Sequence, residues 1–150
     1  MDQESEVRTI TLVIYGEPVP QGRPKVARIG NRVVAYDPPK SRKYKDLVKL
    51  WATTQLKKVD GFKMFSGAVC VDITFYLPIR PSWPKQKRLD AEYGILRPIK
   101  KPDVDNLYKG LVDALTGITW KDDSIITDAS IKKRYTADTS RTEITIKGVV

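Results

Sequence analysis

Hydrophobic and polar residues alternate along five stretches of the chain, a pattern that predicts β-strands. The clearest stretch covers residues 68–77, where Val69, Val71, Ile73 and Phe75 fall on one face and polar residues on the other. Because both ends are well defined and one face is wholly apolar, we expect this strand to be central in a sheet. The other predicted strands cover residues 8–15, 31–36, 125–134 and 142–149.

Two stretches have the spacing of amphipathic helices. In residues 40–57 the apolar positions recur every three or four residues, and Asp37-Pro38-Pro39 just before them is a helix-start signal. In residues 105–116 the apolar side chains again share one arc. At 100° per residue, the opposite arc carries polar residues only, namely Asp105, Asn106, Lys109 and Asp113. The second helix therefore presents a polar stripe that is available for chemistry.

Proline-rich segments separate these elements. Residues 16–25, GEPVPQGRPK, predict an ordered and extended loop, because three prolines cannot continue a helix or a central strand. Residues 78–102 contain five prolines, with room for one or two helical turns over residues 85–92. The whole pattern predicts a single α+β domain over residues 1–150, with a mixed sheet of about four or five strands and two main helices. Residues 1–7 are expected to form a disordered tail.

The positive charge of the chain is concentrated in two segments. The formal net charge is +9, yet residues 23–45 alone hold eight basic residues against one acidic residue, and residues 78–102 hold seven against two. Such local excess favours a phosphate-binding surface, although a solvated basic face without a partner is the simpler alternative. Trp83 and Tyr36 could stack on bases or lie in the core. The candidate DNA-binding residues are Arg23, Lys25, Arg28, Lys85, Lys87, Arg88, Lys100 and Lys101.

The composition excludes several kinds of chemistry. The chain has no histidine, so a Ser-His-Asp triad, a Cys-His nucleophile and imidazole metal ligands are all impossible. Its single cysteine, Cys70, cannot form an intramolecular disulfide or a cysteine zinc site, and we expect it to be a small buried residue. The N-terminus does not resemble a signal peptide, and no apolar run is long enough to span a membrane. We therefore expect a soluble, cytoplasmic protein with no membrane partner and no small-molecule cofactor.

Acidic residues gather within residues 101–124, in contrast to the basic surroundings. Asp103 and Asp105 precede the second helix, and Asp122 and Asp123 follow it. Each has an ordinary explanation: Asp105 as a helix N-cap, an Asp105–Lys109 surface pair, and an exposed turn for the late acids. Converging carboxylates without a cation would repel one another, so the cluster as a whole favours a site for a hard metal ion such as Mg²⁺.

The string KPDVDNLYKGLVDALTGITWKDDSII, together with PVPQGRPK upstream, closely resembles the RusA-like endodeoxyribonucleases, Holliday-junction resolvases that prophages often carry. The resemblance extends from about residue 18 to residue 133 and is specific in its D-x-D-N-x-x-K, D-A-L and D-D core. It implies that Asp103, Asp105 and Asp123 bind Mg²⁺, with Mn²⁺ as a possible substitute. It also implies that Lys109 is the catalytic lysine, and that Asp122, Asp113 and Asn106 have supporting roles.

The resemblance further implies a homodimer with two active sites that cut opposite strands of a four-way DNA junction. It leaves open which of Asp122 and Asp123 binds the metal ion. Two other functions also remain open from the residues themselves. One is a basic DNA-binding module without catalytic activity, and the other is a metal-dependent nuclease that acts on flaps or other branched DNA.

Overall fold

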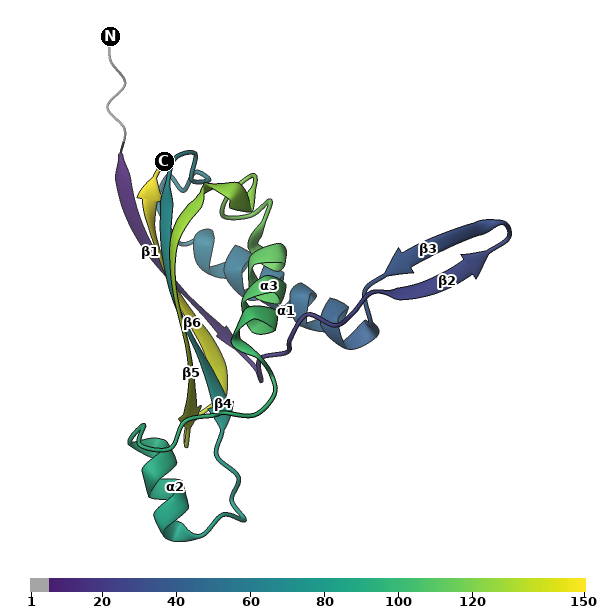
Figure 1. Ribbon diagram of the computed structural model, residues 1–150. Helices are drawn as coiled ribbons and strands as arrows, with labels where there is room; N and C mark the ends of the chain where they lie inside the picture. The colour runs from purple at the N-terminus through teal and green to yellow at the C-terminus, as the bar shows by residue number, and fades with distance from the viewer. Residues whose placement is uncertain (1–5) are drawn as a thin grey trace.

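A mixed four-stranded sheet forms the body of the protein in the computed structural model, which describes residues 6–150. The strand order is β1-β6-β4-β5, and only β4 and β5 run parallel. With three helices added, this is the predicted α+β fold (Figure 1). The strands are β1 (Val7–Tyr15), β4 (Val69–Pro78), β5 (Ile126–Thr136) and β6 (Arg141–Val149).

The alternation of side chains determines which face of the sheet is buried. Val71, Ile73 and Phe75 of β4 are fully buried, as are Ile144 and Ile146 of β6. β4 has a hydrogen-bonded neighbour on each side, which confirms its predicted central position. The opposite face is polar and carries Cys70, which is exposed rather than buried. The expectation that Cys70 is buried was wrong, because its side chain points to the face of the sheet opposite to the apolar side chains of β4.

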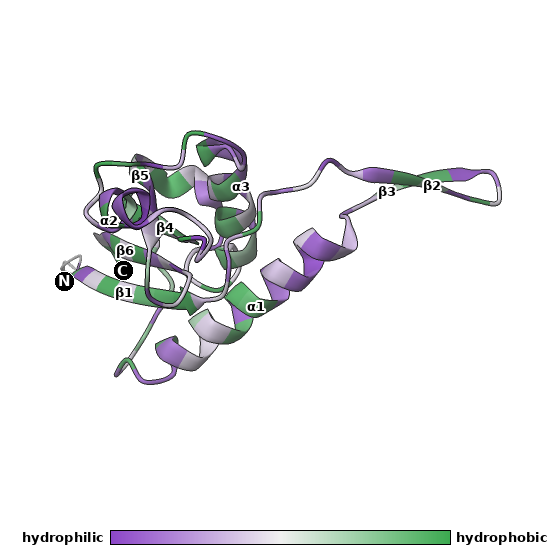
Figure 2. Ribbon diagram, turned by 90° about the horizontal axis from the view of Figure 1, so that it is seen from below, coloured by the Kyte–Doolittle hydropathy of each residue, from purple (hydrophilic) through white to green (hydrophobic). Residues whose placement is uncertain are grey.

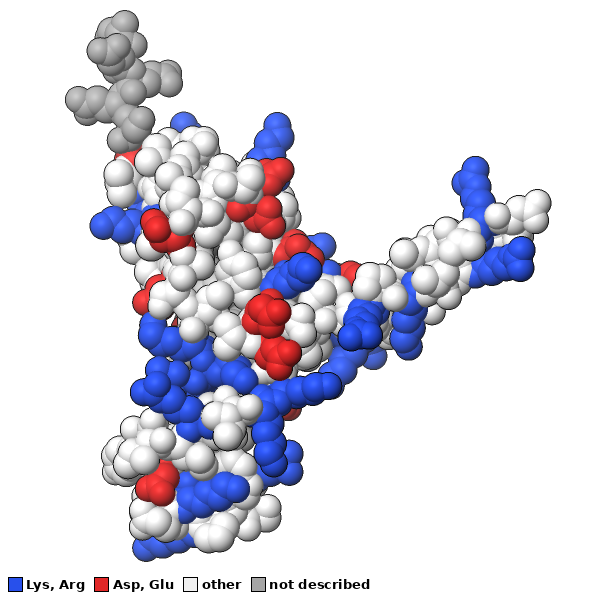
Figure 3. Space-filling model, in the orientation of Figure 1, with Lys and Arg blue, Asp and Glu red and all other residues white. Residues whose placement is uncertain are grey.

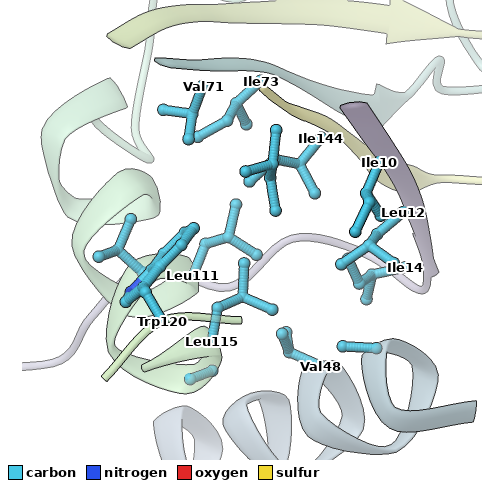
Figure 4. Close-up of a cluster of buried hydrophobic side chains, with 14 of the residues drawn as sticks. Ile10, Leu12, Ile14, Val48, Val71, Ile73, Leu111, Leu115, Trp120 and Ile144 are labelled. Carbon is cyan, nitrogen blue, oxygen red and sulfur yellow. The ribbon is translucent and has the colours of Figure 1, made fainter. Parts of the chain in front are cut away.

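Two helices cover the apolar face of the sheet. They are α1 (Pro39–Leu56) and α3 (Val104–Leu115), which pack against each other, and α1 also packs against β1. Val48 of α1 and Leu111 and Leu115 of α3 point into the same core as Ile144 (Figure 4). This core fixes α3 relative to the sheet, so the polar stripe of α3 is held in a defined orientation.

The third helix lies apart from the core. It is α2 (Lys85–Glu92), which occupies the residues predicted for helical turns within the long segment 78–102. Its composition is mostly hydrophilic (Figure 2), and Ala91 is its one buried residue. α2 contacts β5 and hangs from one end of the sheet (Figure 1).

The N-terminal segment differs from the prediction in two respects. Residues 1–5 of the predicted tail lie outside the described residues, and Val7 already pairs with Val149 in the sheet. The predicted loop over residues 16–25 ends at Pro24, because β2 (Lys25–Ile29) begins there and pairs with β3 (Arg32–Tyr36). Lys25 and Arg28 therefore lie on a strand rather than on a loop. We call residues 25–36 the hairpin arm, which extends away from the body (Figure 1).

No helix among residues 6–150 is both long enough and apolar enough to cross a membrane.

Candidate active site

Helix α3 places its polar stripe at the surface, as the spacing predicted. Leu107, Leu111, Ala114 and Leu115 are fully buried, so the helix cannot rotate without exposing its apolar arc. Asp105, Asn106, Lys109 and Asp113 consequently face outward together. They line one side of a cleft of about 340 Å³, and we call this the α3 cleft.

Asp123 joins the polar stripe from a later part of the chain. It is the first residue of η1 (Asp123–Ile125), a short 3₁₀ turn that precedes β5. Asp123 lines the α3 cleft together with Asp105 and Lys109, and Tyr108 and Val112 complete the wall. The fold thus brings together three of the four residues proposed for catalysis, although Asp123 lies far from the other two in sequence.

Asp103 occupies a different position from Asp105. α3 begins at Val104, so Asp103 and not Asp105 stands at the N-cap, and Asp103 makes no capping hydrogen bond with its side chain. The capping explanation offered for Asp105 is therefore wrong. Asp103 is exposed and is not part of the wall of the α3 cleft. Lys133 fixes the backbone just before Asp103. Its Nζ donates to the Pro102 carbonyl at 2.8 Å and to the Lys100 carbonyl at 3.0 Å.

The proposed metal ligands are not engaged by basic side chains. Within the described part of the chain, Asp103, Asp105, Asp123 and Lys109 form no ion pair, and the one side-chain neighbour that affects Asp123 is the adjacent Asp122. The Asp105–Lys109 surface pair is thus absent from residues 6–150. Over the same residues, no three acidic or cysteine side chains lie close enough together to hold a metal ion between them. The three carboxylates are exposed and free to rotate, and their oxygen atoms are the donors that Mg²⁺ prefers.

The two adjacent acids after α3 have different surroundings. Asp122 accepts a hydrogen bond from the Ser124 backbone N–H at 2.9 Å and caps η1. This bond, together with the side-chain hydroxyl of Ser124, lowers the pKa of Asp122. Asp123 has no such partner and faces the α3 cleft. Burial, and next the nearby charge of Asp123, raise the pKa of Tyr108, so its phenol remains a neutral hydrogen-bond donor in the cleft.

Asp113 is paired with a lysine of helix α1. The Nζ of Lys45, on α1, donates to Asp37 at 2.8 Å and lies 3.6 Å from Asp113. Gln21 also donates to Asp37, at 3.1 Å, while the Gln21 backbone N–H donates to the Asn106 carbonyl at 3.0 Å. This network connects the loop before the hairpin arm, the start of α1 and the polar stripe of α3. It supports the structural role suggested for Asp113.

A second cleft, of about 500 Å³, adjoins the first across Lys109. The two clefts share Asn106, Lys109 and Asp113, and the second also includes Arg23. Lys109 therefore stands on the ridge between two hollows and faces solvent from both. A ligand in either cleft would meet its ammonium group.

Basic residues lie on two sides of the acidic site. Figure 3 shows acidic side chains over the region of α3, with Lys and Arg along the hairpin arm and around α2. Lys100 and Lys101 are exposed and are separated from Asp103 by Pro102, while Lys85 and Arg88 line a pocket of about 380 Å³ beside α2. Lys87 is engaged, since its Nζ lies 4.2 Å from the centroid of the Trp83 ring. The candidate DNA-binding residues thus border the carboxylates from two directions.

Trp83 and Tyr36 differ in their availability for stacking. Trp83 packs edge-on against Tyr135, with ring centroids 5.1 Å apart, and Lys87 covers its face. It therefore braces α2 against β5 instead of offering a free ring. Tyr36 is exposed at the base of the hairpin arm and remains available to a ligand.

Sequence reasoning missed Lys45, Tyr108 and Lys133. A signal for Lys133 was present, because it lies between Ile131 and Tyr135 in the alternation of β5 and pairs with the buried Phe75. A lysine in an apolar register must find polar partners, and here these are two carbonyl groups of the segment before Asp103. Lys45 gave no such signal, because its partners come from two distant segments.

The domain has carboxylates and a lysine without ion-pair partners in a cleft, and basic residues lie on two sides of that cleft. This arrangement is suited to bind a polyanion. The family model "Endodeoxyribonuclease RusA" matches residues 15–147. The chain belongs to this family and is an endodeoxyribonuclease by class. It is also similar to "Uncharacterized protein YqaN" of Bacillus subtilis (strain 168), with 39% identity over 142 residues that cover 93% of this chain and 96% of that protein.

Proposed function

We propose that this protein is a Mg²⁺-dependent, structure-selective endonuclease that resolves four-way DNA junctions by paired symmetric incisions during recombination or repair. One observation carries the proposal: Asp105, Asp123 and Lys109 line a single cleft, and none of them forms an ion pair within residues 6–150. Charged groups left free in a cleft are available to a ligand. The family of the chain makes DNA the expected ligand.

Asp103, Asp105 and Asp123 are the residues that would hold Mg²⁺ or Mn²⁺. Their carboxylates are exposed, and none of the three forms an ion pair within the described residues. Asp122 is the poorer candidate, since its oxygen already accepts the Ser124 N–H. When bound, a divalent ion would polarise the scissile phosphate and lower the pKa of an attacking water.

Lys109 is proposed to stabilise the negative charge that develops on the phosphoryl oxygens. Lys109 is exposed and lines both clefts, so its ammonium group can contact a phosphate bound in either one. Tyr108 and Asn106 line the same cleft and could donate hydrogen bonds to the DNA backbone. The basic residues around α2 and on the hairpin arm would hold the strands that enter and leave the site.

A homodimer would supply the second incision. A four-way junction has approximate two-fold symmetry, and a two-fold dimer presents identical active sites to strands of the same polarity. The proposal therefore requires two copies of this chain on one junction, each with its own carboxylates and its own Lys109.

The deciding experiment uses EDTA-treated protein and three DNA substrates of matched sequence: a mobile four-way junction, a linear duplex and a flap. We expect that added Mg²⁺ causes paired nicks in the junction, with little cutting of the other two. Junction binding without cleavage at any concentration of Mg²⁺ would identify a DNA-binding module instead. Faster cutting of the flap would identify a nuclease for other branched DNA.

An Asp103→Asn variant separates binding from cleavage. The substitution removes one carboxylate but leaves every basic residue in place, so junction affinity should be retained while Mg²⁺-dependent cleavage is lost. Cleavage at a near-normal rate would remove Asp103 from the set of metal ligands.

A further inference from the structure

The hairpin arm has almost no support from the rest of the protein. β2 and β3 hydrogen-bond to each other as a separate two-stranded sheet. Across residues 6–150 they make no more than marginal contacts with any other element. Val26, Ile29 and Val33 are 67%, 67% and 69% exposed, so the apolar residues of the arm are not buried in this chain. An isolated two-stranded hairpin is marginally stable in water, which suggests that the arm is completed by a binding partner.

The charge of the arm indicates the kind of partner. The arm contains no acidic residue and three basic ones, Lys25, Arg28 and Arg32, and Arg23 lies just before it. Figure 3 shows basic side chains along the arm. Two such arms facing each other in a dimer would repel, whereas a polyanion would release counterions on binding to them.

The root of the arm is fixed relative to the α3 cleft. At its N-terminal end, the Gln21 N–H donates to the Asn106 carbonyl and the Gly22 N–H donates to Ser41 Oγ at 2.9 Å. At its C-terminal end, Asp37 is held by Lys45, which also pairs with Asp113. Both ends are thus attached to the elements that carry the polar stripe. Whatever the arm binds is held at a defined offset from Lys109.

We propose that the hairpin arm lies in the major groove of the duplex that flanks the cut site. The inference rests on the proposed function, because it takes DNA as the substrate. Neighbouring strands are about 4.8 Å apart and the groove is about 12 Å wide, so a two-stranded ribbon with its side chains fits. Each strand has five residues, and at about 3.3 Å per residue the arm covers about 16 Å, or about five base pairs.

This position gives the two kinds of exposed side chain on the arm distinct roles. Val26, Arg28 and Val33 share one face of the arm, and Lys25 and Arg32 lie on the other face. The long basic side chains of both faces would reach the phosphates on either side of the groove. Val26 and Val33 are small enough to allow the strands close to the bases, where apolar side chains contact thymine methyl groups. The arm would thereby measure a length of duplex beside the junction.

The test measures binding alone, in EDTA, with a linear duplex and a four-way junction. Arg28→Ser/Arg32→Ser removes two charges from the arm, and Lys57→Ser/Lys58→Ser removes two from the far end of α1 as the matched control. We expect the slope of log affinity against log salt to fall by about 2 for the arm variant on both DNAs, because each duplex phosphate contact contributes about 0.9. The control should keep the wild-type slope. Equal slopes for both variants would overturn the proposal.

A second variant tests the competing occupant, another copy of this chain. Val26→Ser/Val33→Ser should weaken duplex binding while the mass measured by light scattering stays unchanged. If instead it converts dimers to monomers and leaves duplex affinity intact, the arm binds a second copy and the groove proposal fails. These measurements need no cleavage, so they also distinguish the two proposals. Suppose that the wild type cuts no junction, yet the arm variant still has the smaller salt slope. That result would refute the proposed nuclease activity and support the proposed position of the arm in the groove.

Discussion

Lys45 pairs with Asp113 across the two helices of the core, at a distance of 3.6 Å. The Lys45 side chain is only 14% exposed and also holds Asp37, so the ammonium group is confined between two carboxylates. Asp113 lies one turn after Lys109 on the same arc of α3, a spacing at which the two side chains can pair. Within residues 6–150 Asp113 pairs with Lys45 and not with Lys109. The ammonium group of Lys109 consequently remains free for a phosphate.

This arrangement predicts that Lys45→Met lowers the rate of cleavage indirectly. Without Lys45, the Asp113 carboxylate would attract Lys109 and repel the phosphate of the substrate. In a surface cleft this repulsion is on the order of 1 kcal/mol, which is roughly a fivefold loss of rate. The measurement is the single-turnover rate on a four-way junction, compared with junction affinity in EDTA.

The double variant Lys45→Met/Asp113→Asn distinguishes this role from simple structural support. If Lys45 acts by neutralising Asp113, removal of the Asp113 charge should restore most of the lost rate. A double variant that remains as slow as Lys45→Met would show that Lys45 only supports the fold. Thermal unfolding of both variants provides the control.

The adjacent pair Asp122 and Asp123 gives a matched test of the metal ligands. Asp123→Asn should reduce Mg²⁺-dependent cleavage by more than about a hundredfold, comparable to the loss of one preorganised electrostatic group. Asp122→Asn should cleave within a few fold of the wild type, because an amide oxygen can still accept the Ser124 N–H. The reverse ranking would assign the ligand to Asp122.

The sequence predicted the elements that are determined by local patterns. The alternation in β4 and the helical spacing in α3 each reflect burial of one face, and both elements appear within one or two residues of the predicted bounds. The polar stripe of α3 followed from the same spacing. Helix propensity and burial act over a few residues, which is why these features can be read from one stretch of chain.

The remaining features depend on contacts between distant segments. The pairing of Lys45 with Asp113 requires that α1 and α3 lie side by side, which no local pattern determines. Strand β2 was not among the predicted strands, because its residues show no clear alternation after Pro24 and its strand character comes from pairing with β3. The two strands of the hairpin arm have weak patterns, since neither of their faces is buried in this chain.

Gln55 provides a test of the core that is independent of DNA. Its side-chain amide accepts from the Val13 N–H at 2.9 Å and donates to the Val13 carbonyl at 2.6 Å, so it pairs with the free edge of β1. Gln55→Leu keeps the size of the side chain but removes both bonds, and we expect it to lower the free energy of unfolding by about 1–2 kcal/mol. Thr53→Leu, at an exposed position on the same helix, is the control and should be nearly neutral in urea titrations.

Asp37 makes the stability of the protein depend on pH in acid. Its hydrogen bond with Lys45 is the largest cause that lowers the pKa of Asp37 below its ordinary value of 3.8. A lowered pKa in the folded state stabilises the protein above the pKa of the unfolded state, and this contribution is lost as the pH falls through the folded value. Asp37→Asn should therefore be less stable than the wild type at pH 7. The difference should shrink as the pH falls below about 3.8; a constant difference would contradict the assignment.

The neighbouring lysines Lys132 and Lys133 provide the final test, because they carry the same charge on opposite faces of β5. Lys132 pairs with Asp72 at 3.1 Å on the polar face, whereas Lys133 donates to the carbonyls of Lys100 and Pro102 just before Asp103. Lys133→Met should free this segment and displace Asp103, lowering the cleavage rate by about tenfold to a hundredfold, as for residues that orient metal ligands. Lys132→Met loses the same charge and should retain the wild-type rate. Because both variants lose equal attraction for DNA, equal losses of rate would indicate that Lys133 acts only through its charge.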